Sequence, residues 1–213
     1  QLISPSVPTL DPSDTGDRAL DMMQENNLTQ LPMVSEDNFL ALISETEVFD
    51  WATPEAALST SEFTNYKPAI RSGAHPFEAM RIMHEMNLII LPVIDLEQKY
   101  VGCVTKDSLL KYITENSSIL TPGGIIVLEV APRNYTLYEI ARICENEDVT
   151  IMNMQVMVNE LGMLEITLKL NRNSVDAVVS SFERHNYTVK EAYGESINDD
   201  DITGKYHLLM NYI

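Results

Sequence analysis

The side chains that most often bind metals or act as nucleophiles are scattered along this sequence. The four histidines lie in four separate segments: His75, His84, His185 and His207. They form no His-x-x-x-His pair, and Cys103 and Cys144 form no Cys-x-x-Cys pair. The sequence has no Gly-x-Ser-x-Gly motif, no Walker A motif and no dinucleotide-binding glycine pattern. We therefore expect no catalytic residue, no metal, no cofactor and no enzyme activity.

Two pairs of polar residues, each directly after an apolar run, are the main candidates for function. Ser44 and Glu47 are three residues apart, and Thr105 and Ser108 have the same spacing. Lys106 lies beside Thr105. A hydroxyl group at the end of a strand often caps the following helix, and this is one interpretation of Ser44 and Thr105.

The segments that carry these pairs are two copies of one unit. Shifting the sequence by 60 residues aligns identical residues: Pro8 with Pro68, Ala19 with Ala79, Met23 with Met83, Asn27 with Asn87, Leu31 with Leu91 and Pro32 with Pro92. After one extra residue in the second copy, Ser44 aligns with Thr105. Ordered matches over about 40 positions indicate an internal duplication.

Each copy has the pattern of a β-α-β-β-α unit, in which a short extended piece comes first. In the first copy, residues 1–60, we expect a helix at about 15–26, strands at 30–34 and 39–44, and a helix at 45–58. In the second copy, residues 61–116, we expect a helix at 76–86, strands at 90–94 and 100–105, and a helix at 106–112. Neither copy is long enough for a large core, so we expect them to pack sheet against sheet.

This duplicated pattern resembles the cystathionine β-synthase (CBS) repeat, which occurs in tandem as a regulatory pair called the Bateman module. Residues 27–34 read Asn-Leu-x-x-Leu-Pro-Met-Val, and residues 87–94 read Asn-Leu-x-x-Leu-Pro-Val-Ile. Residues 100–110, Tyr-Val-Gly-Cys-Val-Thr-Lys-Asp-Ser-Leu-Leu, look like the family element Gly-hydrophobic-hydrophobic-Thr-x-x-Asp-Leu.

The CBS resemblance implies an adenosyl ligand in the cleft between the repeats. Ser44 with Glu47, or Thr105 with Ser108, would hold its ribose, and Lys106 would meet a phosphate. The resemblance also assigns Ile90 and Pro92 to the base pocket and places Lys67 and Arg71 beside the short strand that borders the cleft. The ligand would be AMP, ATP or S-adenosylmethionine. Residues 1–116 contain 7 basic and 18 acidic side chains, which favours a monophosphate or a less anionic adenosyl compound over ATP.

The second half predicts a different small domain. Residues 117–123 have linker composition, and residues 124–193 follow the order β-α-β-β-α-β of a ferredoxin-like fold. That order, with Leu-Tyr-Glu-Ile-Ala-Arg-Ile at 137–143, resembles an ACT domain, a sensor of amino acids or similar metabolites. Pro132 and Tyr135 occupy the turn positions where that family usually has Asp and Gly. An extension at 194–213 contains a further expected strand at 205–213.

The whole layout predicts a mixed α/β (α+β) protein: a tandem CBS-repeat pair followed by a ferredoxin-like ACT-type domain, similar to acetoin-utilisation-type proteins. A net charge of -18 argues against nucleic acid and anionic membranes as partners. Two cysteines in apolar stretches suggest reduced thiols and a cytoplasmic location. We expect a homodimeric regulatory sensor. The alternatives are a scaffold subunit with decayed ligand sites that acts through a protein partner, or an ACT-centred amino-acid sensor.

Overall fold

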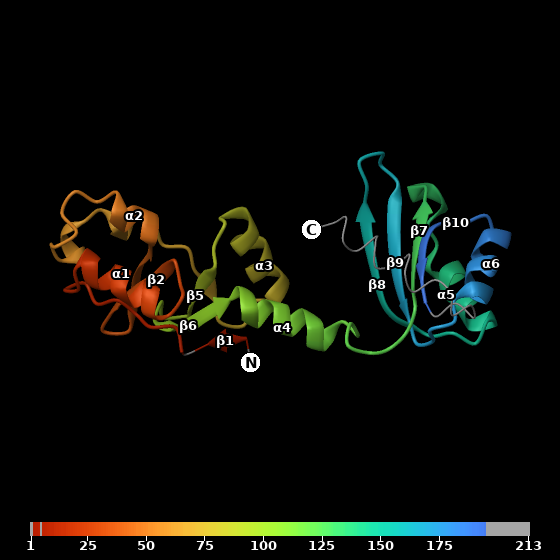
Figure 1. Cartoon of the computed structure of the whole chain (residues 1–213), viewed down its shortest axis with the longest axis horizontal. Helices are drawn as coiled ribbons and strands as arrows, with labels where there is room; N and C mark the ends of the chain where they lie inside the picture. Colours follow the sequence, from red (N-terminus) through yellow and green to blue (C-terminus); the bar gives the residue numbers. More distant parts are fainter. Residues whose placement is uncertain (1, 5, 195–213) are drawn as a thin grey trace. The chain divides into compact units, whose positions relative to one another are not determined.

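The computed structural model describes residues 2–4 and 6–194, which fall into two compact units (Figure 1). Unit 1 is Gln1–Ile113 and unit 2 is Thr114–Ile213. Both mix helices and strands, so the predicted fold class is confirmed. The strand expected at 205–213 lies outside the described residues. In the part of the chain that the structure describes, every helix is too short or too polar to span a membrane.

Unit 1 contains two copies of a helix–strand–strand–helix unit, as the duplication predicts. The first copy comprises α1 (Gly16–Glu25), β2 (Gln30–Ser35), β3 (Asn38–Ser44) and α2 (Glu45–Phe49). The second comprises β4 (Ile70–Arg71), α3 (Pro76–Glu85), β5 (Ile90–Ile94), β6 (Tyr100–Thr105) and α4 (Lys106–Asn116). A short β1 (Ile3–Ser4) precedes α1, and two single 3-10 turns, η1 (Leu58–Thr60) and η2 (Phe63–Asn65), lie between α2 and β4.

The repeated asparagines end the first helix of each copy. Asn27 has φ 52° and Asn87 has φ 51°, in the left-handed region that Asn tolerates better than most residues. The next backbone N–H then turns back to the helix, so that Leu28 N donates to Met23 O at 2.9 Å. The same bond in the second copy, from Leu88 N, is 2.8 Å long. One local rule therefore sets the exit of both helices.

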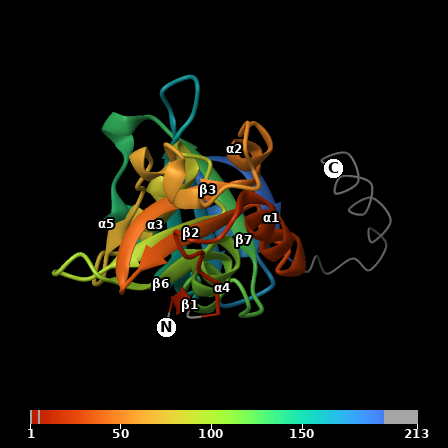
Figure 2. The ribbon, with the colours of Figure 1, turned by 90° about the vertical axis from the view of Figure 1, so that its left-hand side faces the viewer.

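Main-chain hydrogen bonds link the two copies. β1, which precedes α1 in the first copy, pairs antiparallel with β6 of the second copy in the sheet β1-β6-β5-β4. The segment that precedes the second copy approaches the first in turn, since Leu42 N of β3 donates to Tyr66 O at 3.1 Å. In Figure 2, where unit 1 faces the viewer, α1 and α2 lie beside the β2–β3 hairpin, and both helices contact that hairpin.

Both copies contribute to one apolar core. Leu31 and Ile43 of the first copy and Leu91 and Val104 of the second belong to the same cluster of buried residues. Strands β2 and β3 both lie against β5, which agrees with the expected packing of sheet against sheet. A polar contact adds to this interface, because Gln30 Oε1 accepts a hydrogen bond from Ile89 N at 2.9 Å.

The helix expected at 45–58 is wrong beyond Phe49, where α2 ends. Pro54 follows within one and a half turns, and a proline inside a helix removes a donor and clashes with the preceding turn. The chain instead folds back on α1, where Asp17 N donates to Pro54 O at 3.2 Å. A Cβ on Gly16 would lie 2.9 Å from Pro54 O, so the small residue permits this approach. The same return places the side chain of Leu58 fully in the core.

Unit 2 has the predicted ferredoxin-like topology. Its elements are β7 (Ile125–Val130), α5 (Leu137–Asn146), β8 (Ile151–Val158), β9 (Leu164–Leu170), α6 (Asp176–Arg184) and β10 (Thr188–Tyr193). The sheet order is β10-β7-β9-β8, with every neighbouring pair antiparallel. Its core combines one face of the sheet with Ile140 of α5 and Phe182 of α6. The alternation at Leu164, Ile166 and Leu168 thus correctly predicts the buried face of β9.

Both cysteines are buried and free, one in each unit. Burial raises the pKa of Cys103 to about 11, although a hydrogen bond with Tyr100 opposes the shift. Burial also raises the pKa of Cys144 to about 11. Since the thiolate is the reactive form, both side chains act as small apolar residues at neutral pH.

We predict that Leu91→Ala lowers the free energy of unfolding of unit 1 by about 2–5 kcal/mol, because it opens a cavity in the shared core. Leu91 is 0% exposed, whereas Leu96 in the following turn is 84% exposed. Leu96→Ala is therefore the control and should stay within about 0.5 kcal/mol of the wild type. Urea unfolding monitored by circular dichroism gives both values, and equal effects would contradict this assignment of the core.

Candidate functional site

The first polar pair forms a reciprocal helix cap where β3 meets α2. Ser44 N donates to Glu47 Oε2 at 2.9 Å, and Glu47 N donates to Ser44 Oγ at 3.3 Å. The Ser44 hydroxyl also donates to Glu47 Oε2 at 2.6 Å. This capping box satisfies two backbone donors at the start of α2. It also fixes the direction of the Glu47 carboxylate.

The second pair has the same geometry without a charge. Thr105 N donates to Ser108 Oγ at 3.0 Å, and Ser108 N donates to Thr105 Oγ1 at 3.0 Å. The Ser108 hydroxyl donates to Thr105 O at 2.9 Å. A hydroxyl group thus stands where the first copy has a carboxylate, and its proton is already used. The two copies are therefore equivalent as helix caps but different as candidate ligand sites.

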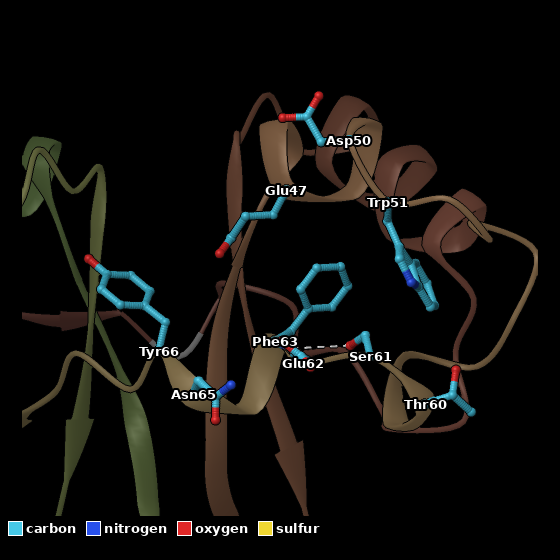
Figure 3. Close-up of a pocket in the computed structure, with 9 residues that line it drawn as sticks. All are labelled: Glu47, Asp50, Trp51, Thr60, Ser61, Glu62, Phe63, Asn65 and Tyr66. Atoms are coloured by element: carbon cyan, nitrogen blue, oxygen red, sulfur yellow. Dashed lines mark hydrogen bonds between the residues drawn. The ribbon is translucent and has the colours of Figure 1, made fainter.

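A cavity of about 570 Å³ opens beside the first pair (Figure 3). It lies between the end of α2 and the two 3-10 turns that lead to the second copy. Nine residues line it: Glu47, Asp50, Trp51, Thr60, Ser61, Glu62, Phe63, Asn65 and Tyr66. Of the residues proposed from the sequence, Glu47 is the one among these nine. The sequence signal for the others is the group of aromatic residues around the only tryptophan, in a stretch expected to be partly helical.

Aromatic side chains form much of the cavity wall. The rings of Trp51 and Phe63 meet edge to face, with centroids 5.2 Å apart and an interplanar angle of 71°. In Figure 3 the Phe63 ring lies between Trp51 and Glu47, and Tyr66 extends on the other side of Glu47. Burial, and then the charge of Glu47, raise the pKa of Tyr66 above its usual value. The Tyr66 hydroxyl therefore stays protonated and can donate a hydrogen bond.

The three predicted cations are not placed on this wall. Lys67 follows Tyr66 in the chain and is exposed, but it does not line the cavity. Arg71 borders a separate cavity of about 210 Å³, beside β1 and the start of α3. Lys106 borders another of about 300 Å³, between α3 and α4. The structure thus does not gather these side chains into one phosphate site.

The residues proposed for the base pocket, Ile90 and Pro92, lie in the core of unit 1. Ile90 is 0% exposed, and Pro92 is also buried. Both belong to β5, which pairs with β4 and β6 and packs against β2 and β3. Their side chains therefore contribute to the packing of unit 1.

Unit 2 has a cavity of about 470 Å³ near the turn between β7 and α5. Asn134 and Thr136 of this turn line it, together with Glu139, His185 and Tyr187 among others. The residues expected to matter, Pro132 and Tyr135, are not part of the lining. Pro132 begins a single 3-10 turn, and Tyr135 packs against the core of unit 2. Among the residues that the structure describes, no three potential metal ligands converge anywhere in either unit.

We predict that Ser44→Ala costs about 1 kcal/mol of stability, because it removes both the acceptor for Glu47 N and the donor to its carboxylate. Glu47→Gln should cost less, since its amide oxygen can still accept from Ser44 N. Urea unfolding of both variants, with the exposed loop change Glu55→Ala as control, measures the difference. The capping role would be refuted by a Ser44→Ala variant as stable as the Glu55→Ala control.

Comparison with known proteins identifies the repeats. A model of the CBS domain matches residues 1–53 and 61–115, just over half of the chain. CBSX2, a CBS-pair protein of Arabidopsis thaliana, has a solved structure in complex with AMP. That structure is 19% identical with a TM-score of 0.47, and the match covers 54% of this chain and 93% of CBSX2.

Two further solved structures match over a similar part of the chain. A CBS domain pair/ACT domain protein of Thermotoga maritima is 16% identical with a TM-score of 0.47, over 54% of this chain and 93% of that protein. The cytosolic domain of the Mg²⁺ channel MgtE in complex with ATP is 22% identical with a TM-score of 0.44, over 52% of this chain and 46% of that structure. With two matched repeats that share one core, this chain belongs to the CBS domain family.

Proposed function

We propose that this protein is a regulatory sensor without catalytic activity, and that unit 1 binds an adenosyl compound in the cavity beside Glu47. The observation that carries the proposal is that Glu47 has two roles. Its carboxylate caps α2 through Ser44 and also lines the cavity of about 570 Å³. The CBS resemblance assigns the residue at this position to the ribose. A cavity of this volume is in the usual range for a ligand of nucleoside size.

The lining offers a partner for each part of an adenosyl group. The bonds from Ser44 to the Glu47 carboxylate both end on Oε2, and a carboxylate has about four acceptor sites, so Glu47 can accept from ribose hydroxyls as well. The aromatic side chains of Trp51, Phe63 and Tyr66 supply faces for an adenine ring. The side-chain amide of Asn65 can meet its polar edge, whereas Ser61 Oγ already donates to Leu58 O at 2.6 Å.

The second copy is a weaker candidate for ligand binding. Thr105 and Ser108 already satisfy each other, and the carboxylate beside them in the chain belongs to Asp107, which is exposed. A phosphate could contact the predicted cations only if the ligand extends beyond the cavity. These candidate contacts are Lys67, Arg71 and Lys106. Both polar pairs already serve as helix caps. This capping role favours the alternative function, a scaffold subunit that binds no small molecule and acts through a protein partner.

For unit 2 we propose an ACT-like role downstream of the repeats, in the layout of acetoin-utilisation-type proteins. Ligand binding would bias the packing of the repeats, and unit 2 would pass that bias on, with a coupling of about 1–3 kcal/mol. The cavity of about 470 Å³ near its first helix supports the further alternative of an amino-acid sensor. A cytoplasmic location, without nucleic-acid or membrane partners, remains part of the proposal.

We predict that the protein binds one of AMP, ATP and S-adenosylmethionine, and that Ser44→Ala combined with Glu47→Ala weakens this binding about tenfold to a hundredfold, because charged hydrogen bonds to the ribose are lost. A thermal-shift screen with AMP, ADP, ATP, S-adenosylmethionine, NADH and the twenty amino acids finds the ligand, and calorimetry gives its Kd. At 100 times Kd a ligand adds about 2.7 kcal/mol of stability, a shift of a few degrees.

The control must lose a helix cap without touching the cavity, since the double variant also destabilises α2. Thr15 caps α1 by accepting from Arg18 N at 3.2 Å and does not line the cavity, so Thr15→Ala serves. It should bind the ligand as the wild type does. A shift with an amino acid alone would move the site to unit 2, and no shift with any compound would favour the scaffold function.

We also propose that the protein is a homodimer and that β8 takes part in the contact. Within the described residues β8 is an edge strand, paired with β9 alone. Its Val156 is 42% exposed and its Val158 is 65% exposed, and an apolar edge strand invites pairing with another chain.

Val158→Lys should shift the mass in solution from twice the chain mass of 24.0 kDa toward 24.0 kDa, because a lysine on an edge strand opposes pairing. Thr188→Lys adds the same charge to the exposed surface of β10, the opposite edge, and should leave the mass unchanged. Light scattering after size-exclusion chromatography measures both masses. A wild-type monomer, or a Val158→Lys dimer, would count against this interface.

A further inference from the structure

The cavity beside Glu47 has an unusual balance of charge for a nucleotide site. Glu47, Asp50 and Glu62 all line it, and none of its nine lining residues is Lys, Arg or His. Proteins that bind phosphate groups concentrate positive charge or free backbone amides around them. A phosphate in this cavity would instead face three carboxylates, which raises the energy of the bound state.

The aromatic part of the wall adds a second, independent feature. Trp51 and Phe63 are partly buried, Tyr66 is 37% exposed, and all three line the cavity. In Figure 3, Glu47 and Phe63 lie between Trp51 and Tyr66, and Asp50 lies at the rim of the cavity. The faces of aromatic rings attract cations, and sites that combine them bind methylated ammonium groups. The aromatic faces and the carboxylates of this wall therefore both favour a positively charged ligand group.

The carboxylate of Glu47 cannot easily turn away from the cavity. Both the backbone N–H and the hydroxyl group of Ser44 hold its Oε2, at 2.9 Å and 2.6 Å. Breaking these bonds would uncap α2. The negative charge on this wall is thus tied to the local fold, whereas the side chain of the nearest cation in sequence, Lys67, is exposed and outside the lining.

We infer that this cavity selects an adenosyl compound whose tail carries a positive charge, a sulfonium or an ammonium group, and discriminates against nucleotides. The inference rests on the proposed function for the adenosyl part of the ligand. The cationic tail would lie against the part of the aromatic wall that the adenine ring leaves open, near the carboxylates of the lining. An adenosyl ligand of this class fits the strongly acidic chain better than AMP or ATP does.

The test compares two ligands that differ by one methyl group and one charge. S-adenosylmethionine carries a sulfonium, and S-adenosylhomocysteine carries a neutral thioether in the same place. Both keep the same amino-acid ammonium and carboxylate, so the comparison isolates the charge at sulfur. Calorimetry with the full chain should give about a twofold to thirtyfold lower Kd for the sulfonium compound, from the cation–aromatic contact. AMP, ATP and tetramethylammonium complete the set of probes. AMP and ATP should bind more weakly than both S-adenosyl compounds.

Two lining variants test the source of the selectivity. Asp50→Asn and Glu62→Gln, both at exposed residues, should each weaken S-adenosylmethionine binding between about 1.5-fold and fivefold and strengthen AMP binding. Glu97→Gln removes the same charge from an exposed turn outside the cavity and should change neither Kd. Lys67→Met should leave S-adenosylmethionine binding unweakened, since this side chain is not expected to contact the ligand.

The outcomes separate this inference from the proposed function. AMP or ATP could bind at least as tightly as S-adenosylmethionine, with this nucleotide binding lost in the Ser44 and Glu47 double variant. That result overturns the charge inference and leaves the adenosyl function standing. If no adenosyl compound binds but tetramethylammonium binds in a Glu62-dependent way, the adenosyl function fails and the preference for a cation stands. Absence of binding by every probe overturns both.

Discussion

The structure of unit 1 depends on one constraint, that neither repeat can bury its own strands. The first repeat contributes a sheet of only two strands, β2 and β3, and an isolated hairpin is marginally stable in water. It becomes stable because β5 of the second repeat covers it and because buried residues of both repeats form one cluster. The positions of all other elements in the unit, including the loop from α2 to β4, follow from this shared core.

The candidate site arises where this core ends. Strands β3 and β6 leave the core at Ser44 and Thr105, and each must pass directly into a helix whose first N–H groups need acceptors. Both copies solve this problem with a reciprocal cap. The first copy uses the charged Glu47 and the second uses the neutral Ser108, so duplication has preserved the structural role while the charge at the two positions has diverged.

Local rules explain which features could be predicted from sequence. The ends of the first helix in each copy and the β2–β3, β5–β6 and β8–β9 hairpins depend on residues close together in the chain, and these predictions are confirmed. The topology of unit 2 includes long-range pairs of β7 with β9 and β10, and its prediction follows from the order of the elements. Pro54 is a local signal that the helix after β3 must end before it, whereas the return of Pro54 to Gly16 is a tertiary contact that the sequence does not reveal. The burial of Ile90 and Pro92 likewise depends on contacts between the repeats. The motif places them on a strand, but only the packing of both repeats shows that β5 is covered.

The cavity beside Glu47 also depends on contacts between residues far apart in the chain. Trp51 and Phe63 are twelve positions apart, and neither belongs to a regular pattern, so their edge-to-face contact could not be inferred from spacing. Their positions depend on how 50–66 returns across the end of the first repeat. Conversely, the capping interpretation of Ser44 and Glu47 was accessible from sequence, because it requires only residues three apart at the start of a helix.

The main-chain hydrogen bonds between the repeats also affect how unit 1 responds to heat and to ligands. Because β1 is hydrogen-bonded to β6, and Tyr66 to β3, neither repeat can open without breaking main-chain bonds that belong to the other. We therefore expect the pair to unfold cooperatively, as one foldon. Free energy gained by a ligand at a single cavity then protects amide hydrogens throughout both repeats against exchange, even in strands that lie far from the bound molecule.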